Sequence, residues 1–173
     1  HRCIATAPAT GRSPAAQEGI AYVPLKGAAL HARGLYRSGD RPMADIDLLL
    51  APRHLRPMSQ ALSALGYRLV SSSADVEVLV PPNRPSRVHL GEHADNGVTI
   101  ELHAAIRHPM PVRQMDITAL LWPAAPHPGP NDYPSKAALM VHLLHHAAAE
   151  AKRSAGSLAS AFCVSLLPTT TPR

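Results

Sequence analysis

The segment Asp45-Ile-Asp-Leu-Leu-Leu50 restricts the fold of this chain more than any other part of the sequence. Successive side chains of a β-strand point to opposite faces, so a strand here places Asp45 and Asp47 on the face opposite to Ile46. The leucine run that follows is typical of a strand buried on both faces of a sheet. Two carboxylates on one face suit Mg²⁺, which proteins bind through one or two carboxylates, water and substrate phosphates. The segment therefore predicts a sheet protein with a divalent-metal site.

The residues before this segment predict a strand, a turn and a helix. The apolar run over residues 20–25 is typical of a strand, and it ends at Lys26 and Gly27. Residues 27–36 have helical spacing. The residues expected on the buried face of this helix are Ala28, Leu30, His31 and Leu35. A loop over residues 38–42, which carries Arg41, then leads into the acidic strand.

Residues 52–66 predict a second helix, and several short strands follow it. Apolar residues at spacings of three and four make this helix amphipathic, and Gly66 is positioned to cap its C-terminal end. Segments with strand character follow at residues 67–71, 76–80, 87–93 and 98–105. Asp95-Asn-Gly97, between the last two segments, is a hairpin signal. These elements predict an α+β fold, in which helices pack against a mixed sheet.

Glu101 lies in the last of these strands, and His103 follows it on the same face. Glu101 can bring a third carboxylate to Asp45 and Asp47, and a bound cation is the normal relief for repulsion among three acids. The sequence leaves three interpretations of His103 open. It could support the metal ligands, contact the acceptor, or occupy an ordinary hydrogen-bonded strand position.

The C-terminal part of the chain predicts two helices separated by a proline-rich stretch. Residues 116–122 predict a short helix that Asp116 caps, and residues 135–152 have the strongest helical pattern of the chain. The expected stripe of the longer helix contains Ala138, Val141, Leu144 and Ala148, with Leu139, His142 and His146 beside it. We expect five parts: an irregular N-terminal arm at 1–16, a core at 17–122, a proline-rich linker at 123–134, a helical segment at 135–166 and a disordered tail at 167–173.

Composition narrows the classes of function. The net charge of +5 suits an anionic ligand such as a nucleotide or nucleic acid, and an arginine-rich chain from a GC-rich genome explains it equally well. No apolar run reaches the roughly 18 residues of a membrane span, so a cytoplasmic protein is expected. Dinucleotide, P-loop and hydrolase motifs are absent from the sequence.

The cysteines and histidines do not predict a disulfide or a zinc site. Cys3 and Cys163 stand alone, without the spacing of a metal or disulfide motif. His142, His145 and His146 have helical spacing, but no cysteine or carboxylate completes a zinc set. Because the chain contains 11 histidines, chance clustering explains this group better.

Five motifs stand in order along the chain: Leu25-Lys-Gly27, Tyr36, Arg41, Asp45-Ile-Asp47 and Glu101-Leu-His103. Together they resemble the family of uncharacterised bacterial nucleotidyltransferases of the polymerase-beta-like superfamily. That superfamily is marked by a glycine turn after the first strand, two acids one residue apart on the second, and a third acid on a later strand. The resemblance covers roughly residues 19–150 and implies the polymerase-beta-like nucleotidyltransferase fold.

The resemblance implies an enzyme that uses Mg²⁺ or Mn²⁺ to move a nucleoside monophosphate from a nucleoside triphosphate, such as ATP, to an acceptor hydroxyl. The implied catalytic and metal-binding residues are Asp45, Asp47 and Glu101, and the implied nucleotide-binding residues are Lys26, Gly27 and Arg41. Glycine lets the backbone approach phosphate closely at a helix start. The superfamily commonly has serine after this glycine, whereas Ala28 stands here. Arg41 is compatible with a bridge to Asp45 or with a phosphate contact.

Two alternatives follow from the same residues. The first is a toxin-like tRNA nucleotidyltransferase, which shares the Lys-Gly, Arg and Asp-x-Asp arrangement. The second is a non-catalytic module that keeps the fold and binds nucleotide or metal. The missing serine and a C-terminus that ends in a Pro/Thr tail like that of a fragment favour this module, whereas the three intact acids oppose it. The acceptor, which could be a small molecule, a protein side chain or an RNA end, and the oligomeric state stay open.

Overall fold

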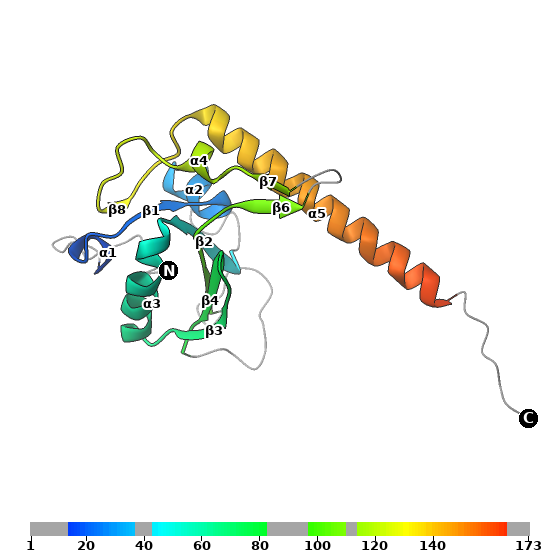
Figure 1. The fold of residues 1–173 in the computed structure, drawn as a ribbon, viewed down its shortest axis with the longest axis horizontal. Coiled ribbons are helices and arrows are strands. Elements are labelled where there is room, and N and C mark those ends of the chain that lie inside the picture. Colours follow the sequence, from blue (N-terminus) through cyan, green and yellow to red (C-terminus); the bar gives the residue numbers. More distant parts are fainter. Residues whose placement is uncertain (1–13, 37–42, 83–96, 110–113, 166–173) are drawn as a thin grey trace, which may run out of the picture.

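The structure, a computed structural model, describes residues 14–36, 43–82, 97–109 and 114–165. A six-stranded mixed sheet with the order β3-β4-β5-β2-β1-β8 lies between two groups of helices (Figure 1). Its strands are β1 (Ala21–Pro24), β2 (Asp45–Leu50), β3 (Arg68–Ser72), β4 (Val76–Val80), β5 (Thr99–His103) and β8 (Gly129–Pro130). The helices are α1 (Pro14–Gln17), α2 (Lys26–Ala32), η1 (Pro52–His54), α3 (Leu55–Ala64), α4 (Thr118–Leu121) and α5 (Lys136–Ser165). β6 (Arg107–Pro109) and β7 (Gln114–Asp116) form a separate two-stranded sheet. The predicted α+β class is confirmed.

Strand β2 lies inside the sheet, and its leucines are buried on both faces, as the sequence predicts. Leu48 and Leu50 pack with Met58 of α3 on one face. Leu49, which has no exposed surface, packs on the other face with Ala29 of α2. Since Asp47 shares the face of Leu49, it points to the side of the sheet that α2 covers.

Strands β2 and β5 pair in parallel, although β3 and β4 separate them in the chain. Asp47 is opposite Glu101, and Leu49 is opposite His103. Paired residues of adjacent strands project to the same face of a sheet. The long-range pairing therefore brings Glu101 and His103 beside Asp47.

Helix α2 is shorter than expected and presents a different face to the core. It ends at Ala32 rather than near Tyr36, and Gly34 follows with φ of 70°. Its buried residue is Ala29, whereas His31 and Leu35 are exposed. The predicted buried face was therefore wrong for His31 and Leu35, whereas Leu30 packs against the core as expected.

The long helix α5 also turns a different stripe inward. The buried residues are Ala138, Leu139, His142, His145 and Ala149. Val141 and Leu144 of the predicted stripe are exposed, Leu144 by 65%. The helix has apolar residues on several sides, so periodicity alone did not identify the packed one. A buried hydrogen bond between His142 and Tyr133 lies on the stripe that packs.

The proline-rich residues 123–134 are fixed to the sheet rather than forming a free connection. Within them, β8 pairs in parallel with β1. The buried Asn131 side chain donates to the carbonyl oxygens of His127 and Gly129, and the Asn131 N–H donates to the carbonyl oxygen of Tyr22. Gly129–Pro130 of this stretch therefore belong to the core sheet. The rest of the expected division of the chain stays a prediction.

Several predictions fall on residues outside the described ranges. They concern residues 1–13 of the N-terminal arm, the loop with Arg41, the strand at 87–93, most of the Asp95-Asn-Gly97 turn and the tail at 167–173. In the described part of the chain, no helix combines the length and the apolar character that crossing a membrane requires.

Candidate functional site

Four polar side chains meet where β1, β2 and β5 come together: Lys26, Asp47, Glu101 and His103. Asp47 Oδ1 accepts a hydrogen bond from Lys26 Nζ at 2.9 Å, and His103 Nε2 lies 3.0 Å from the same oxygen. His103 Nε2 is also 3.5 Å from Glu101 Oε2. Potential ligand atoms of Asp47, Glu101 and His103 all lie within 4.8 Å of one another.

The site has a buried floor and an open rim. The Asp47 side chain is 4% exposed, whereas that of Glu101 is 33% exposed. A small ligand can therefore reach Glu101 from solvent, while Asp47 is held by its neighbours.

The pKa values show that Lys26 and His103 stabilise the ionised form of Asp47. Burial alone would raise the pKa of Asp47, but the hydrogen bond from His103 and the charge of Lys26 lower it to about 2. Burial lowers the pKa of His103, but its hydrogen bonds to Asp47 and Glu101 outweigh this and raise it above the ordinary value. The charged forms of Asp47 and His103 stabilise each other.

Asp45 lies two residues before Asp47, at the exposed start of β2. Its pKa is raised, first by partial burial and then by repulsion from Asp47 and Glu101. The negative charge of the site therefore disfavours the ionised form of Asp45. It does not belong to the group of ligand atoms within 4.8 Å, where His103 is found instead. A metal-binding role for Asp45 stays a prediction.

The turn at Lys26 has an unusual backbone. Lys26 has φ of 48° and is the one non-glycine residue with positive φ in the described part of the chain. For an L-residue this conformation costs about 1–2 kcal/mol. The neighbouring Leu25 N–H donates to the carbonyl oxygen of Asp47 at 2.9 Å, which ties the turn to β2. Backbone strain of this kind often accompanies functional sites.

The other two predicted nucleotide-binding residues have different outcomes. Gly27 is the second residue of α2 and is half-buried, so it lies next to the site. It is not among the glycines with positive φ, so Lys26 carries the left-handed conformation of this turn. Arg41 lies outside the described residues.

The donor set of the site fits a divalent cation. Carboxylate oxygens suit Mg²⁺ and Mn²⁺, and an imidazole nitrogen suits Mn²⁺ and later transition metals. The two carboxylates and the imidazole converge within coordination reach of a single ion. The residues present are therefore compatible with the metal that the resemblance implies.

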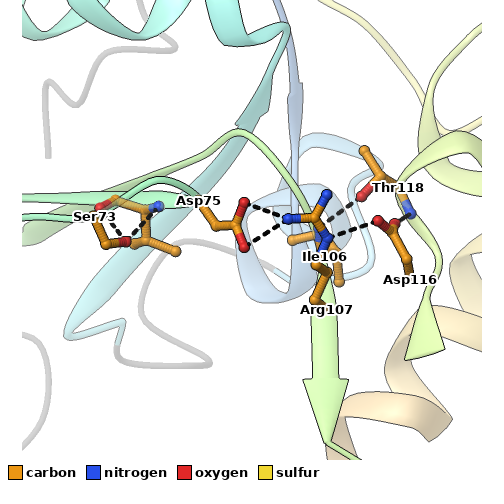
Figure 2. Close-up of polar contacts among 7 residues, drawn as sticks. Ser73, Asp75, Ile106, Arg107, Asp116 and Thr118 are labelled. Atoms are coloured by element: carbon orange, nitrogen blue, oxygen red, sulfur yellow. Dashed lines mark hydrogen bonds and ion pairs between the residues drawn. The ribbon is translucent and has the colours of Figure 1, made fainter. Parts of the chain in front are cut away.

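A second polar cluster, around Arg107, connects elements of the fold (Figure 2). Arg107 Nη1 donates to both carboxylate oxygens of Asp75, at 2.7 and 2.9 Å, and Nε donates to Asp116 Oδ2 at 2.8 Å. Asp116 Oδ1 accepts the Thr118 N–H, and Thr118 Oγ1 accepts the Ile106 N–H. A cavity of about 490 Å³ adjoins Asp116 and Thr118. Since those polar groups already bond within the chain, the cluster holds β6, β7 and α4 together and offers no free ligand.

The histidines of α5 do not form a metal site. Within the described ranges, Asp47, Glu101 and His103 make up the one group of metal-ligating side chains whose atoms lie close enough together. His142 Nδ1 instead lies 2.6 Å from the Tyr133 hydroxyl oxygen in the buried core.

The sequence left His103 undecided and gave no role to Tyr133. For His103 a signal existed, because a residue two positions after Glu101 on a strand must share its face. For Tyr133 there was none, since it lies in a proline-rich stretch far from the acids in the chain. Its position depends on how β8 and α5 pack.

The comparisons with known proteins agree with this geometry. Residues 15–161 match the model of a family described as uncharacterised nucleotidyltransferase. No curated protein and no solved structure matches the chain. The family match runs from α1 into α5 and includes every residue of the site. The chain therefore belongs to the family of uncharacterised nucleotidyltransferases.

Proposed function

We propose that the protein is an enzyme that uses Mg²⁺ or Mn²⁺ to transfer a nucleoside monophosphate from a nucleoside triphosphate, with ATP as the first candidate. The observation that carries the proposal is the meeting of Asp47, Glu101 and His103 within 4.8 Å on two paired strands. The family match supports the transfer of a nucleotide. The acceptor is a hydroxyl group of a small molecule, a protein or an RNA.

Asp47 and Glu101 would hold the metal, with Asp45 and the neutral form of His103 as further ligands. The metal supplies charge neutralisation on the phosphates and lowers the pKa of the attacking hydroxyl. Asp45, at the exposed start of β2, extends the negative charge toward the rim. This arrangement adds an imidazole to the three acids that the sequence suggests.

In the proposed reaction, the acceptor oxygen forms a bond to the α-phosphorus. The bond from this phosphorus to the oxygen that bridges it to the β-phosphate breaks, and pyrophosphate leaves with the electron pair. Glu101 accepts the hydroxyl proton, because its carboxylate is more exposed than that of Asp47.

Lys26 exchanges partners in this scheme. Without ligand, its ammonium lies 2.9 Å from Asp47 Oδ1 and compensates the buried charge. Lys26 would contact the phosphate oxygens of a bound nucleotide once a metal held by Asp47 and Glu101 compensates the charge of Asp47. Gly27 lets the chain pass close to them because it lacks a Cβ. Arg41 is proposed as a further phosphate contact.

Calorimetry with the purified protein tests the proposed function. ATP should bind in the presence of Mg²⁺ or Mn²⁺, and chelation of the metal with EDTA should weaken binding at least tenfold, equivalent to about 1.4 kcal/mol. ATP binding that EDTA leaves unchanged would contradict a metal-dependent transferase and favour a non-catalytic nucleotide-binding module.

Replacing Glu101 with Gln should weaken Mn²⁺ binding about three- to tenfold, because one charged ligand at the exposed rim is lost while the shape is kept. Manganese binding can be followed by the loss of the free-ion signal in electron paramagnetic resonance. Glu18→Gln removes a carboxylate from an exposed turn away from the site and should leave the affinity unchanged. Equal affinities of the Glu101→Gln protein and the unmodified protein would remove Glu101 from the ligand set.

A further inference from the structure

The three side chains that converge in the site offer two kinds of ligand atom. Asp47 and Glu101 offer carboxylate oxygens, and His103 offers an imidazole nitrogen. Mg²⁺ binds oxygen ligands and keeps several of its waters. Divalent first-row transition metals, which begin with Mn²⁺, also gain affinity from nitrogen ligands. The nitrogen of His103 therefore bears on which metal the site holds.

The distances suit neighbouring ligands of a single octahedral ion. His103 Nε2 lies 3.0 Å from Asp47 Oδ1 and 3.5 Å from Glu101 Oε2. Two adjacent ligands that each lie about 2.1 Å from an octahedral ion are about 3 Å apart. The contact between Nε2 and Oδ1 is a hydrogen bond in the structure. Because its length is close to the separation of adjacent ligands, both atoms can bind one cation after small movements.

The sheet holds His103 in this position. Its side chain is only 11% exposed. It lies on β5, opposite Leu49 of β2, and both strands are inside the sheet. The imidazole therefore stays beside the two carboxylates whichever ion binds. A ligand position that the imidazole fills is closed to water, which disfavours Mg²⁺ because this ion loses water reluctantly.

The proposed reaction decides among the transition metals. Three protein ligands leave three positions of an octahedral ion for phosphate oxygens and water. Zn²⁺ in a tetrahedral site would keep a single open position. Octahedral coordination by mostly oxygen ligands is typical of Mg²⁺ and Mn²⁺. Of these two ions, Mn²⁺ is the one that gains from the nitrogen, so it suits both the donor set and the reaction.

We propose that His103 binds the metal through Nε2 and makes the site selective for Mn²⁺ over Mg²⁺. The proposal rests on the proposed function, which leaves the choice between the two ions open. It gives the site two acids and a histidine in place of the three acids that the sequence suggests. His103 then determines metal specificity, rather than only supporting Asp47 or contacting the acceptor.

Pulsed electron paramagnetic resonance of the unmodified protein tests the proposal directly. With Mn²⁺ and without nucleotide, the electron spin echo should be modulated by a nitrogen nucleus bound to the metal. Nucleotide is left out because its base contains nitrogen atoms. Labelling the histidines with ¹⁵N should move the modulation to the ¹⁵N frequency. Mn²⁺ that binds without this modulation would overturn the proposal and leave the proposed function intact.

His103→Asn separates metal selectivity from a supporting role, because Asn offers an oxygen in place of the nitrogen. The affinity for Mn²⁺ should fall about three- to tenfold, whereas the affinity for Mg²⁺ should change less than twofold. Calorimetry at mildly alkaline pH measures both affinities, since only the neutral imidazole binds a metal. Equal losses for the two ions would show that His103 acts only through Asp47, and would overturn the proposal.

His127→Asn is the matched control. His127 is exposed, its Nδ1 lies 3.1 Å from the Pro128 carbonyl oxygen, and it does not belong to the group of ligand atoms. This control should keep both metal affinities within about twofold and retain the nitrogen modulation. Failure of the proposed function would look different: Mn²⁺ would bind through nitrogen, but ATP would not bind with it. Unmodified protein that binds no Mn²⁺ would overturn both proposals.

Discussion

The Asp47→Asn protein is expected to lose metal-dependent ATP binding and nucleotidyl transfer by at least about a hundredfold. Asp47 is the buried acid at the centre of the site, and one of its oxygens contacts both Lys26 and His103. Asn keeps the shape and removes the charge that a divalent cation requires. Calorimetry of ATP binding with and without Mn²⁺ measures the loss.

Asp116→Asn is a matched control for this experiment. The pKa of Asp116 is also about 2, because it accepts hydrogen bonds from Thr118 and Arg107, but Asp116 lies outside the site. The control should bind Mn²⁺ and ATP like the unmodified protein. Asp47→Asn protein that is folded and retains full metal-dependent ATP binding would refute the proposed metal site.

Asp47 should also contribute to stability in a pH-dependent way. Its pKa in the folded protein is about 2, below the ordinary 3.8, so the ionised form stabilises the fold above pH 4. The difference corresponds to about 2 kcal/mol, and it is lost as the pH falls from about 4 to about 2. Urea unfolding should therefore find the Asp47→Asn protein less stable at pH 7, with a gap that narrows across this range. A gap independent of pH would contradict the assigned pKa.

Lys26→Met is expected to change two affinities in opposite directions. Removing the ammonium from Asp47 should raise the affinity for Mn²⁺ alone about tenfold, since the cation no longer competes with an internal charge. The affinity for ATP with Mn²⁺ should fall about tenfold, equivalent to about 1.4 kcal/mol, because a phosphate contact is lost. Electron paramagnetic resonance measures the first affinity and calorimetry measures the second.

Lys136→Met, at the exposed start of α5, is the control for a general change of net charge. It should leave both affinities within about twofold. A Lys26→Met protein in which both affinities fall would show that Lys26 supports the fold of the site rather than exchanging between Asp47 and phosphate.

The strand that carries the acids was predictable because its pattern has one interpretation. Asp45–Leu50 combines alternation with a run of three leucines, and the structure gives β2 these bounds. Val76–Val80 was equally clear and forms β4. Both strands are short, apolar and bounded by turn residues, so local sequence determines where they begin and end.

The packing of α5 was not predictable, because the helix offers more than one apolar side. Leu144 fits a helical stripe as well as the buried residues do, yet it is 65% exposed. The choice between the stripes depends on His142, whose hydrogen bond to Tyr133 compensates its burial. Such a partner from outside the helix leaves no periodic signal in the sequence.

The charge balance of the site could also be predicted only in part from the sequence. The sequence identifies acids that repel one another and therefore suggests a bound cation. The structure adds that Lys26 and His103 both contact Asp47, so the chain itself compensates the charge of the buried acid. This could not be inferred from spacing, because the path of the Lys26 side chain follows from a left-handed backbone that is rare for lysine.

Because β2 and β5 pair in parallel, the site residues also favour the correct alignment of these two strands. A slip of one residue would place Ile100 or Leu102 opposite Asp47 and turn the side chains of Glu101 and His103 toward the α3 core. Burying those polar groups among leucines and methionine would be strongly unfavourable. The residues proposed to bind nucleotide thus also destabilise the misaligned sheet during folding. A lineage that replaced them with apolar residues would lose this discrimination together with the chemistry.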